Sequence, residues 1–352
     1  MGNKDTTNPT RRELLAAAGA AAAAAVIGGN PVMAQQRTTG RESGKQKSKQ
    51  LIIDGHSHML MDGDVTGTKR RKVSDLKEID IPKLFKQMDD YGIEMFVSVV
   101  QETKRVWGDW TGTNEIIVDL QKKFPKRFRG VFGAEPLDKN DVFNKKRLGE
   151  FKAAVKDHGV RGLWLGPPYQ HIYANDKRIY PFYEVAVEYD VVVYYHHGGG
   201  IGAGGGKASH APLKYAKPIL LDDVVIDFPS LRMNIEHMAY PWTEELFALM
   251  KHAPNVYTDV CELFSRPTVL AWYLMMAKEY DVIDRIIWGT DYDVYWYKDY
   301  DFTGYFKKVK RETTWIKKDL NVICKRAGWP SLTQDEINGI LYTNVRKLWK
   351  LG

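Results

Sequence analysis

The sequence has little cysteine, no long apolar run and little net charge beyond its first 50 residues. Its two cysteines, Cys261 and Cys324, are too few for a disulfide framework or a thiolate metal cluster. Its longest apolar stretch, residues 14–28, has 15 residues, fewer than the ~20 that span a bilayer. Five of the seven excess positive charges lie in the first 50 residues. We therefore expect no stable membrane anchor and no nucleic-acid partner.

The first 50 residues are predicted to be an export signal followed by a linker. Residues 1–34 combine the paired arginines Arg11 and Arg12, an apolar stretch and a Val-Met-Ala ending, which is the layout of a twin-arginine export signal. This predicts a periplasmic or secreted protein that begins near Gln35. Residues 35–50 are basic and polar without an apolar face, which predicts a disordered linker. Residues 51–352 then form one domain.

From residue 51 onward, short β-branched runs alternate with longer amphipathic ones. The predicted strands are 51–56, 95–100, 128–134, 160–165, 191–196, 232–237, 256–260 and 285–291. Eight strands alternating with helices predict a (β/α)₈ TIM barrel, with extra helices after residue 302 packed outside it. A doubly wound open sheet remains the alternative, because strand counting does not show that the sheet closes.

Polar residues collect at the predicted strand ends, where TIM-barrel active sites form. They are His56 and His58 after strand 1, His196 and His197 after strand 5, His237 after strand 6 and Asp291 after strand 8. Strand alternation places Asp54, His56 and His58 on one face. Two histidines from one strand, another from a neighbouring strand and a carboxylate suit a divalent ion with one position open to water.

These motifs resemble the amidohydrolase superfamily. The similarity lies in the D-x-H-x-H of strand 1, the H-x-G of His196 and Gly198, the histidine of strand 6 and the G-T-D ending at Asp291. Within the superfamily, the motifs more specifically resemble the amidohydrolase-related branch, which includes aminocarboxymuconate-semialdehyde decarboxylase and related decarboxylases and hydrolases. The resemblance implies that His56, His58, His196 and Asp291 bind the metal and that His237 is a catalytic group beside it.

One departure from the superfamily bears on the number of ions. Members with two metals carry a carboxylated lysine on strand 4, where this chain has Trp164 and no lysine. We therefore expect one divalent ion, Zn²⁺ in the first place, with Mn²⁺ or Fe²⁺ as alternatives.

Several residues near the same rim are candidates for contact with a small-molecule substrate. They are His197, Trp107, Trp110, Arg266 and Tyr292. Aromatic rings can stack on a flat substrate, and an arginine can pair with a carboxylate. The glycine-rich stretch 198–206 is expected to be a loop over the site, because no helix follows it directly as a dinucleotide fingerprint requires.

The main functional prediction is an exported hydrolase of a small cyclic, amide or ester substrate. In that mechanism Asp291 is the general base for a metal-activated water, and His237 stabilises the oxyanion. The alternative is a non-oxidative decarboxylase of a small aromatic or unsaturated carboxylic acid, which uses the same residues. A third hypothesis is a non-catalytic metal- or ligand-binding barrel. A homo-oligomer, dimeric or larger, is expected in each case.

Overall fold

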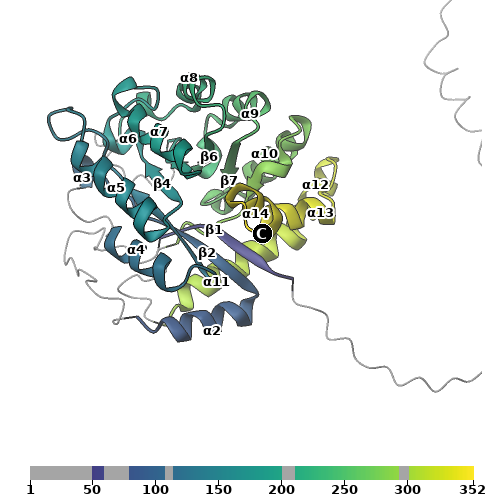
Figure 1. The fold of residues 1–352 in the computed structure, drawn as a ribbon. Coiled ribbons are helices and arrows are strands. Elements are labelled where there is room, and N and C mark those ends of the chain that lie inside the picture. Colours follow the sequence, from purple (N-terminus) through teal and green to yellow (C-terminus); the bar gives the residue numbers. More distant parts are fainter. Residues whose placement is uncertain (1–49, 59–78, 108–113, 200–210, 293–300) are drawn as a thin grey trace, which may run out of the picture. The chain divides into compact units, whose positions relative to one another are not determined.

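Eight parallel strands follow one another around the sheet in chain order (Figure 1). The structure is a computed structural model that describes residues 50–58, 79–107, 114–199, 211–292 and 301–352. Its strands are β1 (Ile52–Ser57), β2 (Ile93–Val99), β3 (Phe128–Gly133), β4 (Gly162–Leu165), β5 (Val192–Tyr195), β6 (Arg232–Ile235), β7 (Val256–Asp259) and β8 (Ile286–Ile287). Each predicted strand is present. The export signal predicted for residues 1–34 and nearly all of the linker lie outside the described residues.

The first and last strands come together and close the sheet. The Gly55 N–H donates to the Trp288 carbonyl at 3.0 Å, and the Asp291 N–H donates to the His56 carbonyl at 2.7 Å. These contacts bring the end of β8 against β1. The predicted (β/α)₈ barrel is thereby confirmed, and the open sheet is excluded.

Helices follow the strands, as the amphipathic stretches predicted. They are α2 (Ile81–Tyr91), α3 (Lys104–Trp107), α4 (Asn114–Lys123), α5 (Lys145–His158), α6 (Pro167–Gln170), α7 (Tyr180–Glu188), α8 (Asp222–Asp227), α9 (Thr243–His252), α10 (Pro267–Glu279), α11 (Thr303–Thr314), α12 (Leu320–Ala327), α13 (Gln334–Asn338) and α14 (Asn344–Trp349). Shorter helical segments are η2 (Lys177–Ile179), η5 (Leu213–Tyr215), η6 (Pro218–Leu221), η7 (Glu236–Ala239), η8 (Leu263–Ser265), η9 (Ile283–Arg285), η10 (Trp315–Asp319) and η11 (Gly339–Thr343). Within the described part of the chain, none of the helices has both the length and the apolar character to span a membrane.

Helix α2 shows how local sequence sets these boundaries. The Asp80 side chain accepts from the Lys83 N–H at 2.9 Å and caps the start of the helix. Gly92 ends it in the left-handed conformation, with φ of 76°, which costs glycine little.

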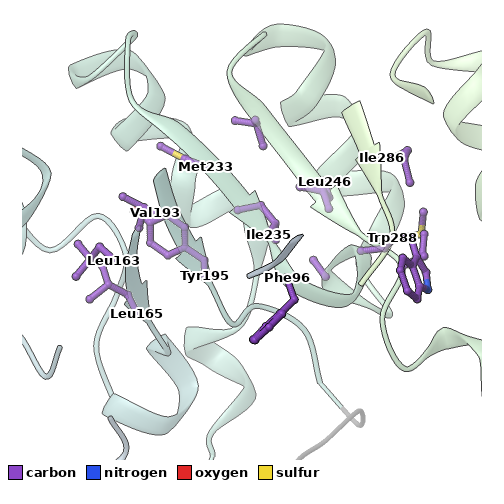
Figure 2. Packing of buried hydrophobic residues seen from close by; sticks show 14 of the residues in the cluster. Phe96, Leu163, Leu165, Val193, Tyr195, Met233, Ile235, Leu246, Ile286 and Trp288 are labelled. Atoms are coloured by element: carbon purple, nitrogen blue, oxygen red, sulfur yellow. The ribbon is translucent and has the colours of Figure 1, made fainter. Parts of the chain in front are cut away.

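The buried apolar residues form two layers, one on each face of the barrel wall. The outer layer packs strand residues such as Leu163, Val193 and Ile235 against the helices (Figure 2). The inner layer includes Val97, Trp164 and Tyr194 from the alternate strand positions. Because successive strand residues face opposite ways, this division shows which residues can reach the lumen.

Helix α14 covers the amino-terminal end of the barrel. Its Trp349 Nε1 donates to the Tyr194 hydroxyl at 3.2 Å inside the lumen, and Arg232 at the start of β6 donates to the Leu348 carbonyl. The carboxyl ends of the strands, at the opposite end, are left for the site.

A buried carboxyl group makes the stability of the fold depend on pH. Glu312 on α11 is 1% exposed and accepts from Trp288 Nε1 at 3.2 Å. Burial raises the pKa of Glu312 to about 8, against the opposing charges of Lys308 and Arg311. The folded state therefore keeps a proton that the unfolded chain loses above about pH 4.5.

We expect Glu312→Gln to stabilise the protein increasingly as the pH rises from about 4.5 to 8. The wild type should lose up to about 1.4 kcal/mol of unfolding free energy per pH unit from this group, and glutamine should not. Urea unfolding of both proteins across this range measures the difference. The exposed substitution Glu244→Gln is the control, and a difference that does not change with pH would contradict the prediction.

Candidate metal centre

Four histidines and an aspartate meet at the carboxyl ends of the barrel strands. His56 lies on β1, His58 follows it, His196 follows β5, His237 lies in η7 and Asp291 follows β8. The ring centres of His56 and His58 are 5.1 Å apart, and those of His196 and His237 are 4.8 Å apart. The centre of the His237 ring is 5.8 Å from that of His56. The structure thus brings together the residues that the resemblance implied.

Asp54 does not join this cluster, which corrects the expected alternation. Its carboxylate accepts from the Thr290 hydroxyl at 2.7 Å and from the Tyr305 hydroxyl of α11 at 3.0 Å. The β1–β2 register shifts between Asp54 and Ser57, and an irregularity of this kind interrupts the alternation of side chains. Asp54 therefore fixes the β8 end to β1 and α11, while His56 faces the lumen.

Three of the histidines have Nδ1 fixed against an acceptor. The pairs are His56 Nδ1 with Asp259 Oδ2 at 3.0 Å, His58 Nδ1 with the Val99 carbonyl at 2.9 Å and His196 Nδ1 with Glu236 Oε2 at 2.8 Å. Carboxylates and carbonyls accept only, so each Nδ1 donates, and in the neutral imidazole Nε2 then keeps its lone pair. Metal-binding histidines usually have this arrangement.

The Nε2 atoms of His56 and His58 both lie close to one carboxylate oxygen of Asp291, an arrangement that favours a cation among the three atoms. His58 Nε2 is 2.8 Å from Asp291 Oδ1, a distance that requires a proton or a metal cation between the two atoms. His56 Nε2 is fully buried and has no hydrogen-bond partner among the described residues, and it lies 3.5 Å from the same carboxylate oxygen. A divalent ion would satisfy all three atoms, so the donor set fits a metal.

Buried carboxylates surround His56 on three sides. Burial lowers its pKa, but the charges of Glu236, Asp259 and Asp291 outweigh this and raise it to about 10, so these charges stabilise either a proton or a metal cation on Nε2. The reciprocal effect of His56 and His237 lowers the pKa of Asp259 to about 2 despite its burial. His56 and the hydrogen bonds from His237 and His58 likewise hold the pKa of Asp291 well below its usual range. Such a concentration of negative charge attracts a cation.

Glu236 and Asp259 are site residues that the sequence motifs did not predict. Asp259 Oδ1 accepts from the His237 N–H at 2.9 Å, and its Oδ2 accepts from Asn234 Nδ2 at 2.8 Å as well as from His56. Both acids end predicted strands, which is the same positional signal that identified Asp291. Their position at strand ends could therefore have identified them from the sequence.

The strand-4 tryptophan contributes a donor to the same network. Trp164 Nε1 donates to Glu236 Oε1 at 3.0 Å, and both side chains are fully buried. An indole nitrogen donates and cannot bind a metal, so Trp164 holds Glu236 in place beside His196.

The backbone that presents His237 and Asp291 is unusual. Both residues have positive φ, 52° and 51°, which non-glycine residues rarely adopt. Gly289 allows β8 to approach β1, because a Cβ there would lie 2.5 Å from the His56 nitrogen. The strand ends are thus shaped to bring the His237 Nε2 to 3.1 Å from Asp291 Oδ2.

The predicted substrate-contact residues are scattered. His197 is buried with its ring centre 5.7 Å from that of Tyr195, which belongs to the outer layer, so the two adjacent histidines face different ways. Arg266 lies over the Tyr240 ring at 5.3 Å and bonds Ser265. The Tyr292 carbonyl accepts from the His58 N–H, which places Tyr292 at the rim. Trp107 ends α3. Trp110 lies outside the described residues, and so do residues 200–206 of the glycine-rich stretch, which was expected to form a loop over the site.

Comparisons with known proteins identify the family of this barrel. The sequence model of the amidohydrolase family matches residues 53–351. No curated protein sequence matches the chain significantly. Many solved structures share the fold.

Three solved structures illustrate the likeness. A probable 2-pyrone-4,6-dicarboxylic acid hydrolase from Acinetobacter baumannii is 14% identical, with a TM-score of 0.53 over 85% of this chain and 99% of that one. A 5-carboxyvanillate decarboxylase from Novosphingobium aromaticivorans, complexed with manganese and a nitrobenzoic acid, is 14% identical, with a TM-score of 0.53 over 91% and 100%. A dihydroxybenzoic acid decarboxylase from Polaromonas, also with bound manganese, is 17% identical, with a TM-score of 0.53 over 86% and 97%.

These comparisons correct the predicted reaction. Two of the three neighbours are decarboxylases of aromatic acids, which goes against hydrolysis as the main reading and favours its alternative. The physical reason for the error is that the two predicted mechanisms assign their steps to the same candidate histidines and Asp291. The residues alone therefore did not separate them.

Proposed function

Because this chain belongs to the amidohydrolase family, we propose that it is a metal-dependent decarboxylase of a small aromatic or unsaturated carboxylic acid. The observation that carries the proposal is the approach of two Nδ1-anchored imidazoles, His56 and His58, to Asp291, with the Nδ1-anchored His196 on the other side of His237. This set is suited to hold a cation against an anionic substrate.

His56, His58, His196 and Asp291 would hold the ion. The unpartnered Nε2 of His56 and the close approach of His58 Nε2 to Asp291 fit this role. When bound, a divalent ion such as Zn²⁺ or Mn²⁺ supplies a positive charge that binds and polarises the oxygen atoms of the substrate. Asp259 and Glu236 orient His56 and His196 through their Nδ1 atoms.

His237 is placed to handle the proton that decarboxylation requires. In this reaction the carbon–carbon bond breaks, CO₂ leaves, and the electron pair left on the substrate carbon takes a proton. His237 Nε2 lies 3.1 Å from Asp291 Oδ2, beside the ion-binding atoms. Burial lowers the pKa of His237, but the hydrogen bond and charge of Asp291 raise it above its ordinary value. The imidazolium can therefore donate to the carbon.

We expect the metal-loaded protein to release CO₂ from at least one member of a panel of hydroxybenzoic and unsaturated carboxylic acids. Product mass and headspace CO₂ measure the reaction, and in D₂O one deuterium should appear on the carbon that loses the carboxylate. Esters, lactones and amides of similar size form the second half of the panel. Products heavier by one water from that half, without CO₂ from the first, would overturn the proposal.

A further inference from the structure

A polar cavity lies at the opposite end of the barrel from the metal centre. Its volume is about 570 Å³, which is within the range of small-molecule sites. Residues at the amino-terminal ends of four strands line the cavity. They are Glu94 near the start of β2, Arg129 near the start of β3, Arg161 directly before β4 and Arg232 at the start of β6. The end of α14 and the residues after it form another wall.

Positive charge exceeds negative charge in this cavity. Six cationic side chains line it, against two carboxylates, Glu94 and Asp190. The carboxylates are already engaged: Arg346 lies 2.7 Å from Glu94, and both Arg232 and Lys350 bind Asp190, at 2.9 and 2.7 Å. Three cations remain without a carboxylate among the described residues: Lys126, Arg129 and Arg161.

Arg129 lies on β3, Arg161 directly precedes the neighbouring strand β4, and both side chains line the same cavity. The β3–β4 register pairs Val131 with Gly162, which brings Arg129 and Arg161 close together. Arg129 donates to the Pro125 and Phe128 carbonyls, and Arg161 donates to the Val155 and Val160 carbonyls. These bonds hold the guanidinium groups without neutralising them. Burial and the nearby charge of Arg161 lower the pKa of Arg129, as expected for two unneutralised cations.

We propose that this cavity binds a small anion with two or more negative charges, carried on phosphate or carboxylate groups, through Arg129 and Arg161. Guanidinium groups bind both kinds of oxyanion in a bidentate manner. A cavity lined by excess charge of one sign also concentrates counterions. This site is independent of the proposed decarboxylase activity, because its residues lie at the other end of the barrel.

Titration calorimetry with inorganic phosphate and with citrate, at fixed ionic strength, tests the proposal. We expect saturable binding of one or both probes at one site per chain. The double variant Arg129→Ala/Arg161→Ala should weaken it at least about tenfold, because each lost charged hydrogen bond has that order of effect. Lys325→Ala/Arg326→Ala removes the same charge from the exposed face of α12 and should leave binding unchanged.

Citrate also chelates metal ions, so each titration is repeated with His56→Ala, in which binding at the basic cavity should persist. Stronger binding of phosphate would indicate a phosphorylated ligand, and stronger binding of citrate a polycarboxylate. Absence of binding by both probes would overturn the proposal. So would binding that the two double variants reduce equally, or that disappears with His56.

Discussion

The His56→Ala variant should lose its metal ion and its turnover together. His56 is fully buried, its Nδ1 is anchored on Asp259, and its Nε2 has no partner within the described structure. Alanine would remove a direct ligand, so the loss of metal affinity should exceed the ~10–100-fold that changes in outer hydrogen-bond partners cause. Elemental analysis of the purified protein and CO₂ release from the identified acid measure the two effects.

A control separates loss of the ion from loss of the fold. His252→Ala changes an exposed histidine that lies 3.6 Å from Asp222, and it should retain both metal and activity. Thermal unfolding of each variant shows whether the barrel is intact. An intact His56→Ala protein with full metal content would contradict the proposed ligand set. Two ions per active wild-type chain would overturn the single-ion expectation based on Trp164.

The barrel could be predicted because its strands and helices have distinct sequence periods. The eight apolar runs are short and β-branched, and helix α2 carries Ile81, Leu84 and Met88 on one buried face. The order of the strands then follows from the alternation with helices. Closure depended on a contact between the two ends of the domain, that of Gly55 with Trp288, which local pattern does not show.

Only part of the site could be predicted, because the sequence shows which residues end strands but does not show side-chain geometry. Strand ends meet at one rim, so His56, His196 and Asp291 could be grouped without knowing their distances. The irregularity in β1 could not be foreseen, and it turned Asp54 towards α11. The roles of Glu236 and Asp259 depend on which ring nitrogen each histidine presents, and only side-chain geometry reveals that.

His237 is the residue whose role the structure makes most open to a direct test. Its Nε2 lies 3.1 Å from Asp291 Oδ2, and atoms of His56, His237 and Asp291 lie close enough together to hold an ion. The geometry therefore allows two roles, a fourth imidazole ligand or a proton donor beside the ion. Nδ1 of His56, His58 and His196 is fixed against an acceptor, as is usual for a metal-binding histidine, whereas His237 contacts Asp291 through Nε2. We therefore assign His237 the role of a donor beside the ion.

We expect His237→Asn to keep near-stoichiometric metal and substrate binding while kcat falls by ~10²–10³, the usual cost of losing a group that acts on developing charge. Asparagine is a suitable replacement because it tolerates the positive φ of 52° at this position, and the backbone N–H can still donate to Asp259. Metal content, thermal unfolding and the pH dependence of kcat and KM on the one variant distinguish the roles. A proton donor leaves metal content and KM nearly constant and removes the basic limb of the kcat profile. Loss of the ion together with activity would make His237 a ligand, and lower stability with unchanged kcat would make it a purely structural residue.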